Sequence, residues 1–386
     1  MSASNIVLVI TANRFPVGDA GAVRLQSFAF ILRELGYTPV VIGLGESTNF
    51  EEKTYEGIRY YSLRYENPQM LFRILGRILY SKHLKKVVRR FDSKIKGILI
   101  DSGDPATLAF VKNFAKKNGA ELMYDSVEWY SESEFKNGSR DVAYRYNNDL
   151  NTKIIDGDYK VIAISSYLER HFRGRDITTV RIPVMMDVKR MPVSIKHREQ
   201  NAPLKIVYAG SIGGKDYIRE MIDGIASLTE QERKQISFCV IGITEEQYSC
   251  RFGAVKAEAA SSVSFMGRIS RDEVLQHLSE ADFSFLLRPA EERYAKAGFP
   301  TKVVEGLASG LPMLCNYSSD LELYLKDGEN AVIIEQCSAQ ACAEALRRAL
   351  KLSSEELYQL SCNARKTAED HFDWRLYTKE IAGLLQ

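Results

Sequence analysis

The chain has 386 residues, of which 45% are hydrophobic and 26% are charged. This balance is that of a soluble globular protein and excludes a disordered, collagen-like or coiled-coil chain, and the length suits two domains of roughly 150 residues each. Fifty-two basic residues against fifty acidic ones leave a net charge of +2, which excludes a global positive field for wrapping nucleic acid.

The N-terminal half opens on a short apolar strand at residues 6–10. A loop with Gly18 and Gly21 follows, then an amphipathic helix that ends near Gly36, and then a second strand at residues 38–44. Because the opening strand is too short for a signal peptide or for the ~20 residues of a membrane span, we expect a cytoplasmic protein. Gly21 allows a close approach of the backbone to a phosphate, and Arg24 suits either a phosphate contact or an ion pair.

The basic stretch 73–90 spaces Lys and Arg among Ile, Leu and Val, as on an amphipathic helix. Two interpretations fit this pattern. One is a solvated helix face against a core, and the other is a surface for anionic lipid at the inner face of the membrane. Both can hold at once, so the sequence leaves a peripheral membrane contact open.

Three further runs in this half, at 97–101, 121–125 and 160–165, are short and rich in β-branched residues, which predicts buried parallel strands. Glu128 and Trp129 come just after the second run, at the end of a strand where ligands of such sheets bind. The carboxylate could orient an acceptor hydroxyl and the indole could stack on a sugar. A surface carboxylate beside a packed Trp is the alternative.

The polar, Pro-bearing stretch 188–203 has the composition of a linker and places a domain boundary near residue 200. The second half then repeats the opening layout, with a strand at 205–209, a Gly-bearing loop and a helix from about 217. Further strands are predicted at residues 236–242, 262–267, 283–287, 312–316 and 331–334. Strands alternating with helices in both halves predict α/β domains with doubly wound parallel sheets.

The loop GSIGGKD, residues 210–216, follows a strand and opens a helix. This placement favours a phosphate-binding loop over a simple turn. Ser211, Gly213 and Lys215 are then the candidate contacts to the phosphates.

The densest signal is the run 298–312, GFPTKVVEGLASGLP. Pro300 suits a helix start and Gly310 suits its end, and the N-terminal turn of such a helix favours a phosphate. Lys302 and Glu305 are three residues apart, so they share a face of the helix. A cation near the phosphates and a carboxylate that accepts two ribose hydroxyls would make a clamp for a nucleoside diphosphate.

This run resembles the donor-site motif of the retaining glycosyltransferases of family 4, in which a helix of the form P-x-K-x-x-E-x-x-A-x-G-x-P receives the nucleotide. All six motif residues stand at the expected spacing. Other pieces agree in order over nearly the whole chain, from the opening strand, loop and helix with Arg24 to the segment FDW near the end. The resemblance implies the GT-B fold, with two Rossmann-like domains facing across a cleft. It implies an acceptor-side domain at 1–190 with a C-terminal crossover helix at 373–386, a linker at 189–202, and a donor domain at 203–372.

The resemblance also implies an activity, namely transfer of a sugar with retention from a nucleotide-diphosphate donor to a glycan or lipid-linked acceptor in bacterial surface polysaccharide synthesis. The transfer would need neither a divalent metal nor a cofactor, and UDP and GDP both stay open as the donor nucleotide. Lys302 and Lys215 would stabilise the leaving diphosphate, and Glu128 would act on the acceptor. The donor contacts implied on the second domain are, besides Glu305 and the loop 210–216, Gly298, Phe299, Thr301, Arg288 and Arg268.

The sequence departs from the family pattern at two positions. The family usually shows two glutamates separated by seven residues; counting back from Glu305, the first of them would stand where this chain has Ala297. The family also often shows a histidine where Val127 stands. An epimerase of the same fold, a phosphorylase and a non-catalytic two-domain nucleotide-binding protein are the alternatives. The histidines and cysteines show no ligand spacing, so we expect no metal site.

Overall fold

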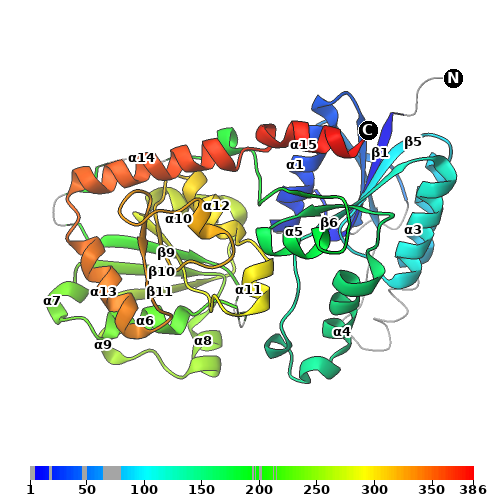
Figure 1. Cartoon of the computed structure of the whole chain (residues 1–386). Coiled ribbons are helices and arrows are strands. Elements are labelled where there is room, and N and C mark those ends of the chain that lie inside the picture. Colours follow the sequence, from blue (N-terminus) through cyan, green and yellow to red (C-terminus); the bar gives the residue numbers. More distant parts are fainter. Residues whose placement is uncertain are drawn as a thin grey trace. The chain divides into compact units, whose positions relative to one another are not determined.

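The computed structural model describes residues 5–16, 20–45, 50–63, 80–193, 195, 197–199, 202–211, 213 and 215–386. The chain divides into two compact units (Figure 1). The first unit comprises Met1–Trp129, Ser139–Asp187 and Trp374–Gln386, and the second comprises Tyr130–Gly138 and Val188–Asp373. The chain therefore passes between the units at 129/130, 138/139, 187/188 and 373/374.

The first unit is built on an eight-stranded sheet with the order β3-β4-β2-β1-β5-β6-β7-β8. All neighbouring strands are parallel except β3 and β4. The strands are β1 (Ile6–Arg14), β2 (Thr38–Leu44), β3 (Lys53–Tyr55), β4 (Ile58–Leu63), β5 (Ile95–Ile100), β6 (Glu121–Ser126), β7 (Lys160–Ala163) and β8 (Thr179–Arg181).

Helices cover this sheet, and the last residues of the chain join them. Trp374 packs on the ring of Phe30, with 5.7 Å between the ring centroids, and Ile381 and Leu384 are buried in the same core. The helices are α1 (Ala20–Glu34), α3 (Pro105–Asn118), α4 (Val142–Asp149), α5 (Ser166–Arg173) and α15 (Thr378–Leu384), with the shorter turns η1 (Arg89–Phe91), η3 (Gly138–Arg140), η4 (Leu150–Ile154) and η7 (Trp374–Tyr377).

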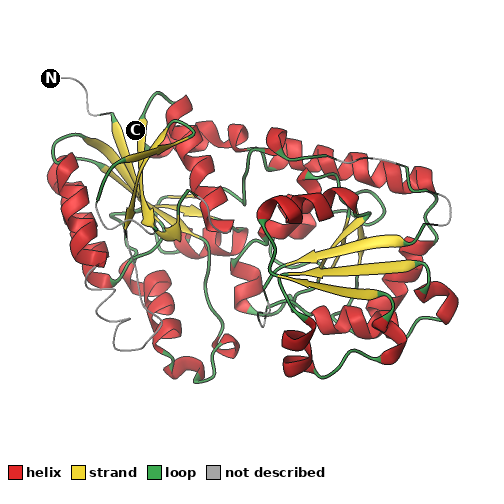
Figure 2. Ribbon diagram, turned by 180° about the vertical axis from the view of Figure 1, so that it is seen from behind, coloured by secondary structure: helices red, strands yellow, loops and turns green. Residues whose placement is uncertain are grey.

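The second unit holds a six-stranded parallel sheet with the order β11-β10-β9-β12-β13-β14. Figure 2 shows helices on both faces of this sheet. Its strands are β9 (Leu204–Ala209), β10 (Ile236–Ile241), β11 (Val263–Gly267), β12 (Phe283–Leu286), β13 (Met313–Cys315) and β14 (Ala331–Ile333). Its helices are α6 (Ile218–Ala226), α7 (Glu230–Arg233), α8 (Glu245–Phe252), α9 (Ala257–Ala260), α10 (Arg271–Glu280), α11 (Arg293–Ala297), α12 (Thr301–Ala308), α13 (Ala339–Leu350) and α14 (Ser354–His371), with the turns η2 (Glu132–Glu134), η5 (Val188–Arg190) and η6 (Leu321–Leu323).

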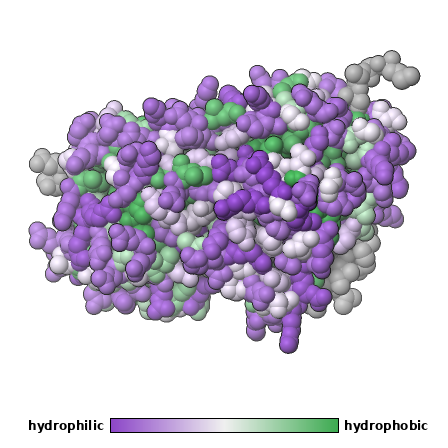
Figure 3. Space-filling view, in the orientation of Figure 1, coloured by the Kyte–Doolittle hydropathy of each residue, from purple (hydrophilic) through white to green (hydrophobic). Residues whose placement is uncertain are grey.

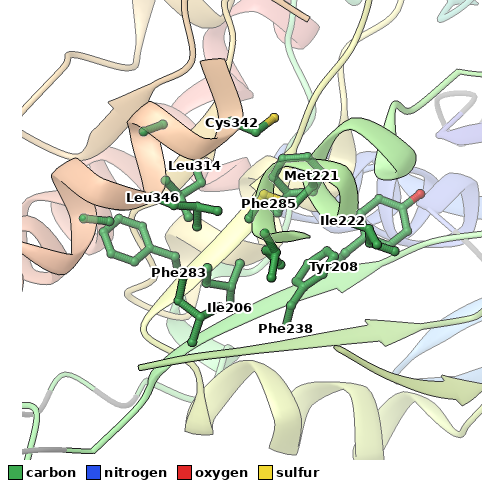
Figure 4. Close-up of a cluster of buried hydrophobic side chains, with 14 of the residues drawn as sticks. Ile206, Tyr208, Met221, Ile222, Phe238, Phe283, Phe285, Leu314, Cys342 and Leu346 are labelled. Atoms are coloured by element: carbon green, nitrogen blue, oxygen red, sulfur yellow. The ribbon is translucent and has the colours of Figure 1, made fainter. Parts of the chain in front are cut away.

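The core of the second unit lies between its sheet, α6 and α13 (Figure 4). Phe238, Phe283 and Phe285 of the strands are fully buried, and Met221 of α6 and Leu346 of α13 pack against them. Burying an aromatic or aliphatic side chain of this size contributes about 1.5–3 kcal/mol. This core fixes the edge of the sheet on which the functional side chains lie.

The two parallel α/β sheets confirm the predicted fold class. Each strand predicted from the sequence is present, and the helix predicted to begin after Pro300 runs over Thr301–Ala308. Three strands of the first unit, β3, β4 and β8, were not predicted.

The basic stretch 73–90 is described only in part, since residues 73–79, like Gly18, lie outside the described residues. Residues 80–88 are helical, with Leu84 and Val88 buried and Lys82 and Lys86 exposed. The described part therefore carries a solvated basic face over a buried apolar one. Over the part of the chain that the structure describes, no helix has the length and the apolar character needed to cross a membrane. The face drawn in Figure 3 is mostly hydrophilic.

Candidate functional site

A cluster of buried charges lies at the carboxyl ends of the strands of the second sheet. Asp216, in the loop before α6, accepts a hydrogen bond from Lys302 of α12 and forms an ion pair with it. The Nε atom of Arg288, just after β12, lies 2.6 Å from Oδ1 of Asp216. The hydroxyl of Tyr208 on β9 donates to Oδ2 of Asp216 over 2.8 Å. The carboxyl edge of a parallel sheet is where ligands of such folds bind.

The cluster is shielded from solvent, and its charges depend on one another. The side chains of Asp216, Arg288 and Lys302 are 8%, 13% and 16% exposed. Burial alone would raise the pKa of the Asp216 carboxyl, but the charges of Lys302 and Arg288 outweigh burial and hold this pKa well below its usual range. Burial lowers the pKa of the Lys302 ammonium, and the charge of Asp216 opposes that shift.

Two glycines make room for this cluster. A Cβ atom on Gly210 would lie 2.6 Å from Nζ of Lys302 and 2.6 Å from the hydroxyl oxygen of Tyr208. Gly242, which follows β10, has a φ of +93°, and a Cβ there would meet the carbonyl oxygen of Gly210. The ammonium of Lys302 therefore reaches Asp216 only because position 210 has no side chain.

Arg288 is fixed through its backbone as well. Its N–H donates to Oδ1 of Asn316 over 2.9 Å, and the side-chain amide of Asn316 donates back to the carbonyl of Arg288 over 2.7 Å. Asn316 directly follows β13, so two neighbouring strands hold the start of this loop. The guanidinium thus stands on a rigid part of the unit.

Glu305 lies one turn after Lys302 on α12, as its spacing predicted. Its side chain is 18% exposed and forms an ion pair with Arg271, the first residue of α10, with 2.9 Å between Nη1 and Oε1. The helix presents Val303, Val304 and Leu307 to the core, so Lys302 and Glu305 stand on the side away from it. A carboxylate and an ammonium spaced in this way can hold a ribose and a phosphate of the same ligand.

Lys215 sits in a cage formed by the segment Tyr130–Glu134 and by Tyr294 of α11. Its ammonium lies 3.2 Å from Oε1 of Glu134, and 5.4 Å and 5.6 Å from the ring centroids of Tyr130 and Tyr294. Contacts of this kind between a cation and aromatic faces stabilise by about 0.5–2 kcal/mol each. The cage fixes the position of the Lys215 ammonium, and the sequence of the loop alone does not show this.

The segment that supplies this cage is anchored on α11. The guanidinium of Arg293 donates to the carbonyl of Tyr130, and the N–H of Tyr294 donates to Oγ of Ser131 over 3.1 Å. Glu134 accepts from the N–H of Ser131 over 2.9 Å as part of a capping box. Residues 130–138 thus belong to the second unit although they lie between two elements of the first.

The other residues that were predicted to contact the donor differ in how exposed they are. Ser211 and Gly213 are exposed in the loop before α6, and Arg268 is exposed just after β11. Gly298 and Thr301 are half-buried on either side of the start of α12. Phe299 is only 6% exposed, between the rings of Tyr324 and Phe372 at 5.7 Å each, so it supports the start of α12 from the core.

In the first unit, Arg24 forms an ion pair, one of the two roles that the sequence left open. Its guanidinium binds both oxygens of Asp125, at 2.8 and 2.7 Å, and donates to the carbonyls of Ile182 and Pro183. Both charged side chains are almost fully buried. A phosphate contact by Arg24 stays a prediction.

Gly21, Glu128 and Trp129 have different surroundings in the first unit. A Cβ on Gly21 would lie 2.7 Å from the side chain of Asn13, and an approach of this backbone to a phosphate stays a prediction. Glu128 is exposed. Trp129 is only 8% exposed, its Nε1 donates to Asn148 over 3.1 Å and its ring lies 4.3 Å from that of His171. The packed Trp that was the alternative interpretation is what the structure contains.

A polar cluster around Asp101, at the end of β5, escaped sequence reasoning. Its carboxylate accepts from Thr11 over 2.6 Å, from Asn13 over 2.9 Å, and from Ser102. Burial raises the pKa of Asp101 to about 6, against the hydrogen bonds from Ser102 and Thr11, which lower it. The signal available in the sequence was an aspartate at a strand end.

Asp216, Tyr208 and Arg271 also escaped sequence reasoning, although Asp216 stands inside the loop that was singled out. Within the described ranges, no group of three or more His, Cys, Asp or Glu side chains is arranged to hold a metal ion. The second unit brings together two cations, a carboxylate partner and a helix N-terminus. Chemically this arrangement can hold a multiply charged anion and stabilise negative charge that develops on it.

Comparison with known proteins gives a family match in the second unit. Residues 193–367 match the family described as glycosyl transferases group 1. Among curated proteins, the chain is 23% identical over 184 residues to WcaL of Escherichia coli (strain K12), named as a colanic acid biosynthesis glycosyltransferase. That alignment covers 48% of this chain and 45% of WcaL, so the chain spans about half the length of the curated relatives it matches.

Solved structures resemble the chain over almost all of its length. Sucrose-phosphate synthase from Thermosynechococcus elongatus has a TM-score of 0.77 and 14% identity, with 98% of each chain covered. Anabaena Alr3699/HepE in complex with UDP and glucose has a TM-score of 0.70 and 14% identity, with 98% of this chain and 99% of that chain covered. At these identities the likeness concerns the fold, and it confirms the GT-B architecture predicted from the sequence.

Proposed function

We propose that the chain is a group 1 glycosyltransferase, the family that residues 193–367 match, and that it transfers a sugar from a nucleotide-diphosphate donor to a glycan or lipid-linked acceptor. The observation that carries this proposal is α12, which places Lys302 and Glu305 on one side of a helix beside Arg288. Such a site suits the ribose and the diphosphate of the donor together.

In this proposal Glu305 accepts hydrogen bonds from the ribose hydroxyls. Arg271, which pairs with Glu305 at 2.9 Å, holds the carboxylate in place. Lys302, Arg288 and Lys215 meet the negative charge that grows on the leaving diphosphate as the bond to the sugar breaks. Fixed cations in a shielded site stabilise such charge without the reorganisation that water would need.

A UDP-linked donor is our choice between UDP and GDP. The similar HepE structure is a complex with UDP and glucose, and the two chains share a fold at a TM-score of 0.70. The acceptor that we propose is a growing surface polysaccharide or its lipid-linked precursor, because the relative WcaL is named for colanic acid biosynthesis. Glu128, exposed at the end of β6, is the proposed group on the acceptor side.

We also propose that the protein works at the inner face of the membrane. Lys82, Lys86, Arg89 and Arg90 are exposed on one helical stretch of the first unit. Basic side chains near an anionic surface attract it by about 1 kcal/mol each. A lipid-linked acceptor would be met at such a surface.

Glu305→Ala tests the donor site. Calorimetric titration with UDP and with GDP should show that the variant loses at least about a hundredfold in affinity for the preferred nucleotide, because two hydrogen bonds to a charged group are lost at about 1.5–3 kcal/mol each. Glu322→Ala, at an exposed position of the same unit, is the matched control and should bind like the wild type. Unchanged binding by Glu305→Ala would place the donor elsewhere.

A panel of UDP- and GDP-sugars then separates the activities. A transferase releases the nucleotide slowly in water and faster with the acceptor. An epimerase instead changes the sugar while the nucleotide stays attached, and a non-catalytic binding protein gives affinity with no turnover. The proposed function is supported only if the wild type releases the nucleotide and Glu305→Ala abolishes this release.

A further inference from the structure

We propose that Asp216 is a positioning residue that holds Lys302 and Arg288 side by side as cations for the donor diphosphate. This inference rests on the proposed function and deepens it. Sequence reasoning assigned Asp216 no role. The proposal stands on the contacts of its carboxylate, which is shared by both cations and by one hydroxyl.

The geometry of Asp216 divides its two oxygens between the two cations. Oδ1 receives Nε of Arg288 at 2.6 Å, while Oδ2 receives Nζ of Lys302 and the hydroxyl of Tyr208. The three partners come from β9, from the loop after β12 and from α12. The carboxylate thus connects three elements that the chain brings together from distant positions.

Without a counter-charge, two cations could not be kept this close in a shielded place. Arg288 and Lys302 repel one another, and taking charges out of water is costly unless they are paired. With Asp216 ionised, the three groups carry two positive charges and one negative, a net charge of +1. Asp216 therefore lets both cations stay charged and still leaves an excess charge for a phosphate.

Lys302 is the cation of the cluster that can lose its proton. An arginine stays protonated in proteins, whereas a buried lysine readily loses its proton. Among the described residues, Lys302 contacts the carboxylate of Asp216 and the ring of Tyr208, whose centroid lies 4.1 Å from Nζ, and the charges of Arg288 and Glu305 also act on it. Among these Asp216 gives the strongest support to the charged form.

The first test measures the charge of Lys302 directly. Lysine labelled with carbon-13 at Cε is followed by NMR as the pH is raised, and Lys302→Met assigns the signal. In Asp216→Asn the pKa of Lys302 should fall by at least about one unit relative to the wild type. Asp223→Asn, which removes an ion-paired carboxylate of α6 outside the cluster, should leave it in place. An unchanged pKa in Asp216→Asn would overturn the proposal.

The second variant removes the positive charge of Arg288 instead of the negative charge of Asp216. Arg288→Gln removes a cation that disfavours the charged form of Lys302, so the pKa of Lys302 should rise. This variant keeps Asp216 and decides the question even if Asp216→Asn does not fold. A pKa that falls or stays constant would contradict the electrostatic arrangement proposed here.

The third test links the cluster to phosphate binding. Between about pH 7.5 and 9.5 the affinity of Asp216→Asn for UDP should fall by about tenfold more than that of the wild type, while its affinity for uridine stays constant. The sign follows from the lowered pKa, because Lys302 loses its charge as the pH rises. Asp216→Asn combined with Lys302→Arg should remove this pH dependence, which a merely structural role would not do.

The outcomes separate this inference from the proposed function. If Lys302→Met weakens the binding of UDP but the UDP affinity of Asp216→Asn has no added pH dependence, the proposed donor site stands and the role of Asp216 is rejected. If Lys302→Met and Glu305→Ala both leave UDP binding unchanged, the proposed donor site itself is wrong.

Discussion

At the scale of single residues, the absence of a side chain at position 210 decides what its neighbours can do. The sequence pattern marked Gly210 as part of a loop, but its importance lies in the space that it leaves for the ammonium of Lys302 and the hydroxyl of Tyr208. A methyl group would have to displace one of them. Because Tyr208 is fully buried, the ammonium is the group that would move.

Gly210→Ala should therefore weaken the binding of UDP by about tenfold, the cost of displacing one charged contact of roughly 1.5 kcal/mol. The binding of uridine should change little. Gly157→Ala is the control, since nothing lies within 4 Å of a Cβ at that position. The measurement is a calorimetric titration, and equal loss of UDP and uridine affinity would indicate general misfolding instead.

At the scale of elements, local signals in the sequence predicted best the elements that depend on local chemistry. Pro300 and Gly310 bracket α12, and the helix runs over Thr301–Ala308, because caps and breakers act through the neighbouring backbone. The hairpin β3–β4 was not predicted from the sequence. In the structure, its turn residues Glu56 and Gly57 have φ values of 48° and 77°. Two positive φ values favour a tight hairpin turn with glycine second.

Gly57→Ala should destabilise the first unit by about 1 kcal/mol, since alanine is strained at positive φ and its Cβ would meet the guanidinium of Arg33. Glu56→Asn should instead stabilise the first unit, because asparagine tolerates this backbone conformation better than glutamate. Denaturant unfolding of both variants measures the difference. A stabilising Gly57→Ala would show that the turn differs from the one described.

The candidate site could be predicted from the sequence only as far as its motif extends. Lys302 and Glu305 followed from spacing on one helix, and Lys215 from its loop. Asp216 binds partners that are 72 and 86 residues away along the chain, and Arg271 pairs with Glu305 across 34 residues. No local pattern encodes such pairs, because they arise only when the strands of the sheet are stacked in their final order.

At the scale of the whole molecule, the chemistry that we propose relies on fixed cations. Lys302, Arg288 and Lys215 would share the charge of the leaving diphosphate, a task that other enzymes give to a bound divalent ion. We therefore predict that UDP affinity and the release of UDP from the preferred donor change by less than about twofold in EDTA. Calorimetry and a nucleotide-release assay with and without magnesium measure this. A loss in EDTA that magnesium restores would contradict the prediction.

The path of the chain between its two units has a consequence for protein engineering. Residues 130–138 belong with the second unit, and Arg293 and Tyr294 hold them there by hydrogen bonds to Tyr130 and Ser131. A chimaera that replaces only the residues after the linker would give this short insert foreign neighbours and leave Lys215 without its cage. Recombination between relatives that exchanges the whole second unit must therefore exchange two separate stretches of the gene together, the long one and the one that encodes nine residues.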